Sequence, residues 1–215
     1  MKRSHVISAV LCLFFSVQHV HSASGNVAKD LVDRLFDTYM KAKSGEVRKD
    51  DKNIDDIEKL IKSYINHYES IVNLNDTRTL TISCLVSELI MFTNRKDLYE
   101  KFINFASRQK SAEECLSIGL AKLFIKNPKI VIMSTKNWSD GRKCDFLERL
   151  AFGLRNILKN PALFLQDTRR KMDKLDYDSF ILQLLDLVKW DKTGSEKKKK
   201  TKPFCQRLWD KREKT

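Results

Sequence analysis

The chain contains few of the residues that form tight turns. Its 215 residues include 6 glycines and 3 prolines, together about 4% of the chain, where average usage gives roughly 12%. All-β sandwiches, barrels and propellers need many tight turns, so this shortage argues against them. Hydrophobic residues make up 42% of the chain and aromatic residues 9%, which is enough for a packed core. We therefore expect an all-α protein, an irregular bundle of about seven to nine helices held together by disulfides.

Long hydrophobic runs are missing beyond the start of the chain. The best candidate for a membrane span, Leu80–Phe92, is shorter than the roughly 18 apolar residues that a transmembrane helix needs, and it contains Glu88. At the start, basic residues 2–3 precede the apolar run Val6–Val17, and small residues follow from Ser22. That order is typical of a secretory signal peptide, and an uncleaved signal anchor is the alternative. We therefore expect a secreted, extracellular protein without a membrane span.

Cleavage after Ser22 removes the signal peptide, residues 1–22, and changes the net charge and the numbers of histidines and cysteines. This segment carries two of the 41 basic residues and no acidic one, which leaves 39 basic and 28 acidic residues and a charge of +11. It also carries three of the four histidines, so only His67 remains. One histidine is too few for a two-histidine metal site, and the cysteines form no CxxC knuckle. We expect no metal and no cofactor.

The mature chain keeps four of the five cysteines. An even set in an oxidising compartment predicts two disulfides, and four buried thiols are the alternative. Of the three possible connectivities, we favour Cys84–Cys115 and Cys144–Cys205. In the chain-entropy model, each such loop stabilises the fold by roughly 3–4 kcal/mol. The bridges are expected to be structural.

Apolar residues recur at helical spacing along most of the mature chain. They predict helices over residues 27–40, 54–72, 76–93, 96–107, 111–126, 141–159 and 177–188, with a further helix that begins at Pro161 after an Asn160 cap. Residues 49–52 read as a charged loop. Residues 129–135 fit either a short helix or a strand, and the helix is favoured because a lone strand has no partner. We assign residues 23–190 to one helical domain.

Two sequons lie between predicted helices, where surface loops are expected. Asn75 and Asn137 are therefore candidate glycosylation sites. Trp138, beside the second sequon, is a candidate contact for a partner because aromatic residues are enriched in binding hot spots. The simpler interpretation of Trp138 is a core or half-core residue.

The excess positive charge is concentrated near the C-terminus. Residues 189–215 contain 11 basic and 4 acidic residues, a net charge of +7, which leaves +4 for residues 23–188. The basic C-terminal segment, residues 191–215, contains the lysine block: Lys197, Lys198, Lys199, Lys200 and Lys202. Such a block attracts polyanions, and outside a cell these are glycosaminoglycans such as heparan sulfate rather than nucleic acid. A bridge at Cys205 would tether the block at both ends, and the alternative is a solvated linker.

The residue sets that mark common enzymes are absent. The chain has no GxSxG elbow and no GxxxxGK[ST] loop. A serine triad would have to use His67, which lies on the polar edge of a predicted helix. Adjacent acidic pairs such as Asp55-Asp56 do not share a helix face. We therefore expect a protein that is not an enzyme.

The combined features resemble the small secreted helical proteins in the saliva of blood-feeding insects. Among these, the chain is similar to the neutrophil-stimulating type of mosquito salivary factor, through the leader that ends at residues 21–24 and the spaced cysteines. Venom and parasite-secreted effectors share these features. The resemblance implies a basic protein that modulates host immune cells, through neutrophils or cytokines, or haemostasis at a bite site. Its expected partner is a cell-surface receptor or the extracellular matrix, bound by a monomer.

A second function class is a carrier of a small hydrophobic ligand. It predicts an apolar pocket among six phenylalanines, and the alternative is that these rings fill the core. The six are Phe92, Phe102, Phe105, Phe124, Phe146 and Phe152.

Overall fold

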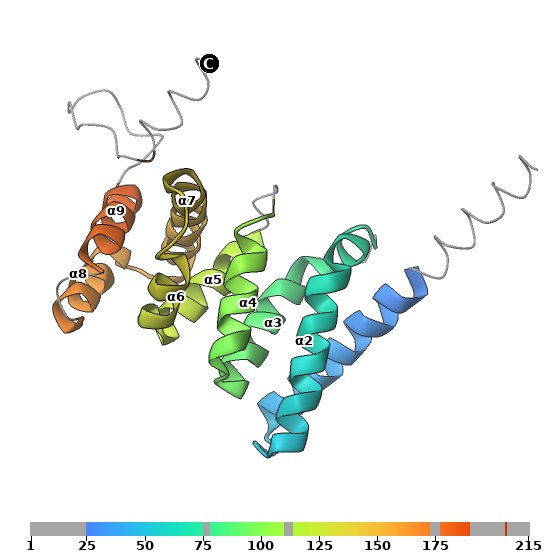
Figure 1. Cartoon of the computed structure of the whole chain (residues 1–215). Helices are drawn as coiled ribbons and strands as arrows, with labels where there is room; N and C mark the ends of the chain where they lie inside the picture. Colours follow the sequence, from blue (N-terminus) through green and yellow to red (C-terminus); the bar gives the residue numbers. More distant parts are fainter. Residues whose placement is uncertain (1–24, 75–77, 110–113, 173–176, 190–204, 206–215) are drawn as a thin grey trace, which may run out of the picture. The chain divides into compact units, whose positions relative to one another are not determined.

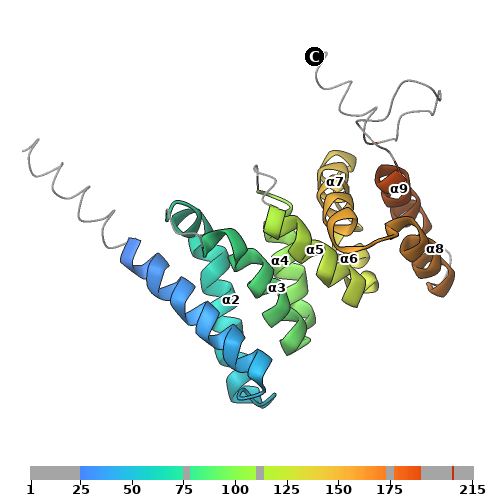
Figure 2. The same ribbon diagram turned by 180° about the vertical axis from the view of Figure 1, so that it is seen from behind.

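The computed structural model describes residues 25–74, 78–109, 114–172, 177–189 and Cys205 (Figures 1 and 2). Within these residues every regular element is a helix, which confirms the predicted all-α class. The predicted signal peptide, the Asn75 sequon and the lysine block lie outside the described residues.

The chain divides into two compact units, residues 1–82 and 83–215, and the boundary falls inside helix α3 (Thr79–Thr93). The sequence had predicted one helical domain over residues 23–190. Periodicity identifies each helix separately, and it does not reveal which helices pack together. The division into two units follows from that packing.

The first unit contains a helix over residues 25–44, helix α2 (Asp51–Val72) and the first residues of α3. The first helix extends beyond the predicted residues 27–40 and ends before Gly45, which adopts a φ of +81° that favours glycine. Helix α2 begins earlier than expected, inside the predicted charged loop, because the Asp50 side chain accepts a hydrogen bond from the Asn53 amide at 2.9 Å.

Buried apolar stripes on these two helices supply the core of the first unit. They contain Ala28, Leu31, Val32, Leu35, Ile57, Leu60, Ile61, Tyr64, Tyr68 and Ile71. Glu58, which the periodicity places on the solvated face, is only 8% exposed and forms an ion pair with Lys62. A second ion pair joins Arg78, at the start of α3, to Asp33 on the first helix.

The second unit contains residues 83–93 of α3 and all the remaining helices. The remaining helices are α4 (Lys96–Ala106), α5 (Glu114–Lys126), α6 (Pro128–Thr135), α7 (Asp140–Ile157), α8 (Pro161–Lys171) and α9 (Asp178–Lys189). Helix α7 packs against α5 and α9, α4 packs against α5 and α6, and α8 packs against α9 (Figure 1). Helix α7 therefore connects the α5 side of this unit to the α9 side.

Local capping sets several of these helix starts. The side chains of Asn127, Ser139 and Asn160 each accept a hydrogen bond from the amide three residues later. Proline occupies the first turn of α6 and α8, where its missing N–H costs no helical hydrogen bond. Residues 129–135, ambiguous in the sequence, are thus helical as favoured.

Arginines on α7 bind the C-terminal ends of neighbouring helices. Arg149 donates to the Ala106 carbonyl at 3.0 Å and to the Gln109 carbonyl, both at the end of α4. Arg155 donates to the Leu187 carbonyl of α9 at 3.1 Å. The last carbonyls of a helix lack intrahelical partners and carry partial negative charge, so these contacts stabilise both helix ends.

Candidate functional site

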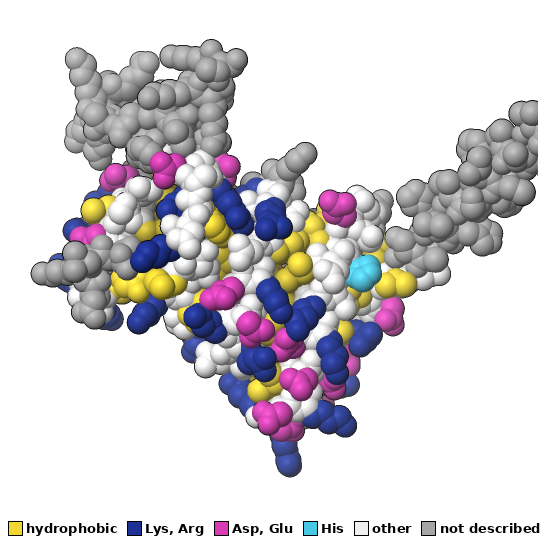
Figure 3. All heavy atoms as spheres, viewed as in Figure 1, with side chains coloured by type: hydrophobic (Ala, Val, Ile, Leu, Met, Phe, Trp, Pro, Cys, Tyr) yellow, Lys and Arg dark blue, Asp and Glu magenta, His cyan; other side chains and the backbone are white. Residues whose placement is uncertain are grey.

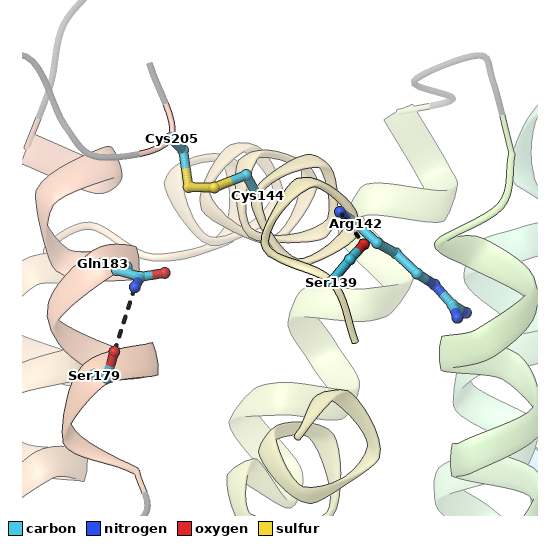
Figure 4. Close-up of a disulfide and its surroundings, with 6 residues drawn as sticks. All are labelled: Ser139, Arg142, Cys144, Ser179, Gln183 and Cys205. Carbon is cyan, nitrogen blue, oxygen red and sulfur yellow. Dashed lines mark hydrogen bonds between the residues drawn. A yellow bond between two sulfur atoms is a disulfide. The ribbon is translucent and has the colours of Figure 1, made fainter. Parts of the chain in front are cut away.

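A disulfide joins Cys144 on α7 to Cys205, as predicted (Figure 4). The two sulfurs are 2.08 Å apart and the two Cα atoms 5.2 Å apart, across a separation of 61 residues. Both residues are 1% exposed. The bridge therefore anchors residue 205 in the core of the second unit.

This bridge determines how the segment that contains the lysine block is attached to the folded protein. The block lies in sequence between Lys189, the last residue of α9, and the bridged Cys205. Helix α9 packs on α7, which carries the other half of the bridge. Both ends of the connecting segment are therefore attached to the same pair of helices.

The other two cysteines are thiols in the structure, so the predicted bond between them is not formed there. Cys84 on α3 and Cys115 on α5 are both half-buried. The Cys84 thiol donates to the main-chain carbonyl of Cys115 at 3.4 Å. Burial raises the pKa of the Cys84 thiol, the hydrogen bond with Cys115 adds to the increase, and the Lys122 charge opposes it. The predicted Cys84–Cys115 disulfide is therefore wrong, and the two residues are joined by a hydrogen bond instead.

A pocket of about 250 Å³ lies in the second unit between α6, the start of α7 and α9. Its lining includes apolar side chains from α6 and α9, and two lysines that flank the loop between α6 and α7. Ser179 and Gln183 on α9 also line it, and Figure 4 shows them on the side of α9 that faces α7. The sequence does not predict this site, because no pattern of residue spacing connects residues 132–143 with residues 177–183.

Trp138 is a packing residue. Its ring contacts Phe146 edge-on, with centroids 5.5 Å apart. The Arg142 guanidinium lies 3.8 Å from the Trp138 centroid and donates to Ser107 and Asn104 at the end of α4. Burial, together with the charge of Arg108, lowers the pKa of Arg142. The simpler interpretation of Trp138, as a half-core residue, fits these contacts.

The two remaining polar candidates are exposed. Asn137 lies in the loop between α6 and α7, and the hydroxyl of its sequon partner Ser139 caps α7. His67 is exposed on α2, with Nδ1 2.9 Å from the Ser63 carbonyl. This position fits a surface histidine.

The six phenylalanines of the carrier hypothesis do not line this pocket. Phe102, Phe124 and Phe146 are fully buried, and Phe105 is nearly so. Phe92 is half-buried, and Phe152 is 41% exposed. The buried rings fill the core, as the alternative interpretation holds.

In the part of the chain that the structure describes, no group of three or more His, Cys, Asp or Glu side chains is arranged to hold a metal ion. Within the same residues, no helix has the length and apolar character that crossing a bilayer requires. Comparison of the chain with protein-family models, with characterised proteins and with solved structures gave no match.

Proposed function

We propose that the protein is a secreted, non-enzymatic effector that binds sulfated cell surfaces through its lysine block and modulates host immune cells. The observation that carries this proposal is the Cys144–Cys205 bridge. Buried disulfides form and persist in oxidising compartments, which supports secretion. The same bridge supports a binding role for the adjacent lysines, because it attaches the Cys205 end of the segment that contains them, and α9 already holds the other end.

Tethering matters for binding because a polyanion must order the segment that it contacts. A segment attached at both ends has less freedom to lose on binding than a free tail of the same sequence. The lysines at 197–200 supply four charges within four residues. Their attraction to sulfate groups is electrostatic, so it should weaken steeply with salt.

The rest of the mature chain has a smaller net positive charge than the C-terminal segment. Basic and acidic side chains are interspersed over α2 on the face shown in Figure 3. Several exposed lysines and arginines pair with neighbouring acids on the same helix, such as Lys41 with Asp37 and Lys59 with Asp56. Such exposed pairs stabilise little, but they lower the net charge of the surface.

Heparin chromatography tests this proposal. Replacement of Lys197, Lys198, Lys199 and Lys200 by alanine should move elution to clearly lower salt. The matched control replaces four exposed lysines elsewhere, Lys29, Lys52, Lys126 and Lys129, by alanine and so has the same net charge. The control should elute close to the unmodified protein. Equal shifts in both variants would mean that only net charge matters, and the proposal for the lysine block would be wrong.

A further inference from the structure

We infer that the pocket between α6, α7 and α9 binds a small molecule with an apolar body and a carboxylate head. This inference is independent of the proposed function, because it uses none of the residues of the lysine block. It rests on the lining of the pocket: an apolar floor, a hydroxyl that can donate and a half-buried lysine lie around one cavity of about 250 Å³.

The floor of the pocket is apolar and held in place by packing. Ile132 on α6 is 4% exposed and Phe180 on α9 is 8% exposed. The Phe180 ring stacks on the fully buried Phe124, with centroids 6.2 Å apart and an interplanar angle of 29°. Met133, which is 44% exposed, also lines the pocket and can adapt to a ligand because its side chain is unbranched and flexible. An apolar group can therefore be buried here.

One hydroxyl on the wall is arranged to donate to a ligand. Gln183 Nε2 donates to Ser179 Oγ at 3.3 Å (Figure 4). Because Ser179 Oγ accepts this bond, its own hydrogen remains available to an acceptor in the pocket. The hydroxyl of Thr135 differs, since it already donates to the Ile132 carbonyl at 2.8 Å.

The charges around the pocket favour an anion. Lys136 and Lys143 contribute two positive charges and Asp140 one negative charge. Lys143 is half-buried, and among the described residues its Nζ has no ion-pair partner within 4.0 Å. A charge held partly out of water is stabilised by a counter-charge, which a ligand carboxylate would supply. The positive ends of α7, which begins at Asp140, and of α9, which begins at Asp178, border the same pocket.

The volume limits the size of the ligand. Pockets for drug-sized molecules begin at roughly 300 Å³, slightly above the volume seen here. A short aliphatic or single-ring carboxylic acid fits this space, whereas a long-chain lipid does not. The apolar body would lie on Ile132 and Phe180, and the carboxylate would accept hydrogen bonds from Lys143 Nζ and Ser179 Oγ.

Titration calorimetry with octanoate and its neutral isostere octanamide tests this assignment on the full, disulfide-bonded protein. Octanoate should bind saturably and at least five times more tightly than octanamide. Lys143→Met should weaken octanoate binding at least fivefold and leave octanamide binding unchanged. Lys129→Met removes the same charge from the exposed side of α6 and should change neither affinity. Unchanged melting temperatures would confirm that both variants fold.

Four results would overturn the inference. Equal affinity for octanoate and octanamide would show that the carboxylate charge of the ligand does not contribute to binding. Tighter binding of octylamine than of octanoate would show that the pocket prefers a cation, through Asp140. If octanoate, octanamide and octylamine all fail to bind saturably, the pocket is not a binding site for such ligands. A filling variant, Ser179→Trp, locates the ligand because Ser179 is an exposed residue that lines the pocket. Octanoate binding should be lost in this variant, and retained binding would place the ligand elsewhere.

Discussion

At the scale of single residues, the four cysteines that the structure describes occupy two different environments. Cys144 and Cys205 are bonded and almost completely buried. Cys84 and Cys115 are half-buried thiols that share a hydrogen bond. The sequence predicted the Cys144–Cys205 bond correctly, and its prediction of a Cys84–Cys115 bond is wrong in this structure. It did not predict the difference in environment, which depends on how α3 and α5 pack.

The environment of Cys84 predicts slow reaction with alkylating agents. Only the thiolate is nucleophilic, and burial raises the pKa of this thiol well above its usual value of about 8.5. Alkylation of Cys84 by iodoacetamide in the folded protein should therefore be at least tenfold slower at pH 7.5 than in urea-unfolded protein. The rate should continue to rise about tenfold per pH unit from pH 7 to pH 9. Peptide mass spectrometry measures both rates, and a plateau near pH 8.5 would contradict the raised pKa.

At the scale of elements, the crossing of α5 and α7 depends on a missing side chain. A Cβ atom placed on Gly153 of α7 would lie 2.1 Å from the Ser117 carbonyl oxygen and 2.9 Å from the Ala121 Cβ. Both contacts are shorter than van der Waals separation, and the nearer one is to the backbone of α5. The two helices can approach this closely only with glycine at position 153.

Gly153→Ala should therefore destabilise the protein, because α7 or α5 must shift to relieve the overlap. We expect a loss of about 3 kcal/mol in the free energy of unfolding, measured by urea denaturation. Gly25→Ala is the matched control, since a Cβ there meets no atom within 4 Å. The control should change stability little. Equal stability of the two variants would show that the crossing is looser than the structure indicates.

The elements themselves were largely predictable because their signals are local. Asn160 followed by a proline predicted the start of α8. Helix α2 began earlier than expected because Asp50 supplies a cap that apolar spacing does not reveal. Glu58 was misplaced for a related reason: periodicity assigns it to the polar face, and its ion pair with Lys62 allows its burial.

At the scale of the whole molecule, the sequence predicted the chemistry of the bridge and missed the pocket. An even number of cysteines after the predicted signal peptide indicated two disulfides, and the connectivity favoured among the three possible ones contained the Cys144–Cys205 pair. The pocket depends on α9 returning to α6 and α7, and residues about 40 positions apart in the sequence meet there. No local pattern encodes that meeting. The division into two units escaped prediction for the same reason.

We propose that the disulfide-bonded protein acts on immune cells. The most direct measurement exposes naive leukocytes to refolded, endotoxin-free mature protein and measures cytokine transcripts and neutrophil activation. We expect the unmodified protein to raise cytokine transcripts and activate neutrophils. This response should be lost in Cys144→Ser/Cys205→Ser protein and reduced when the four lysines at 197–200 are replaced by alanine. The four-lysine control variant should retain the response. Absence of any response to the unmodified protein at micromolar dose would contradict the proposed action on immune cells.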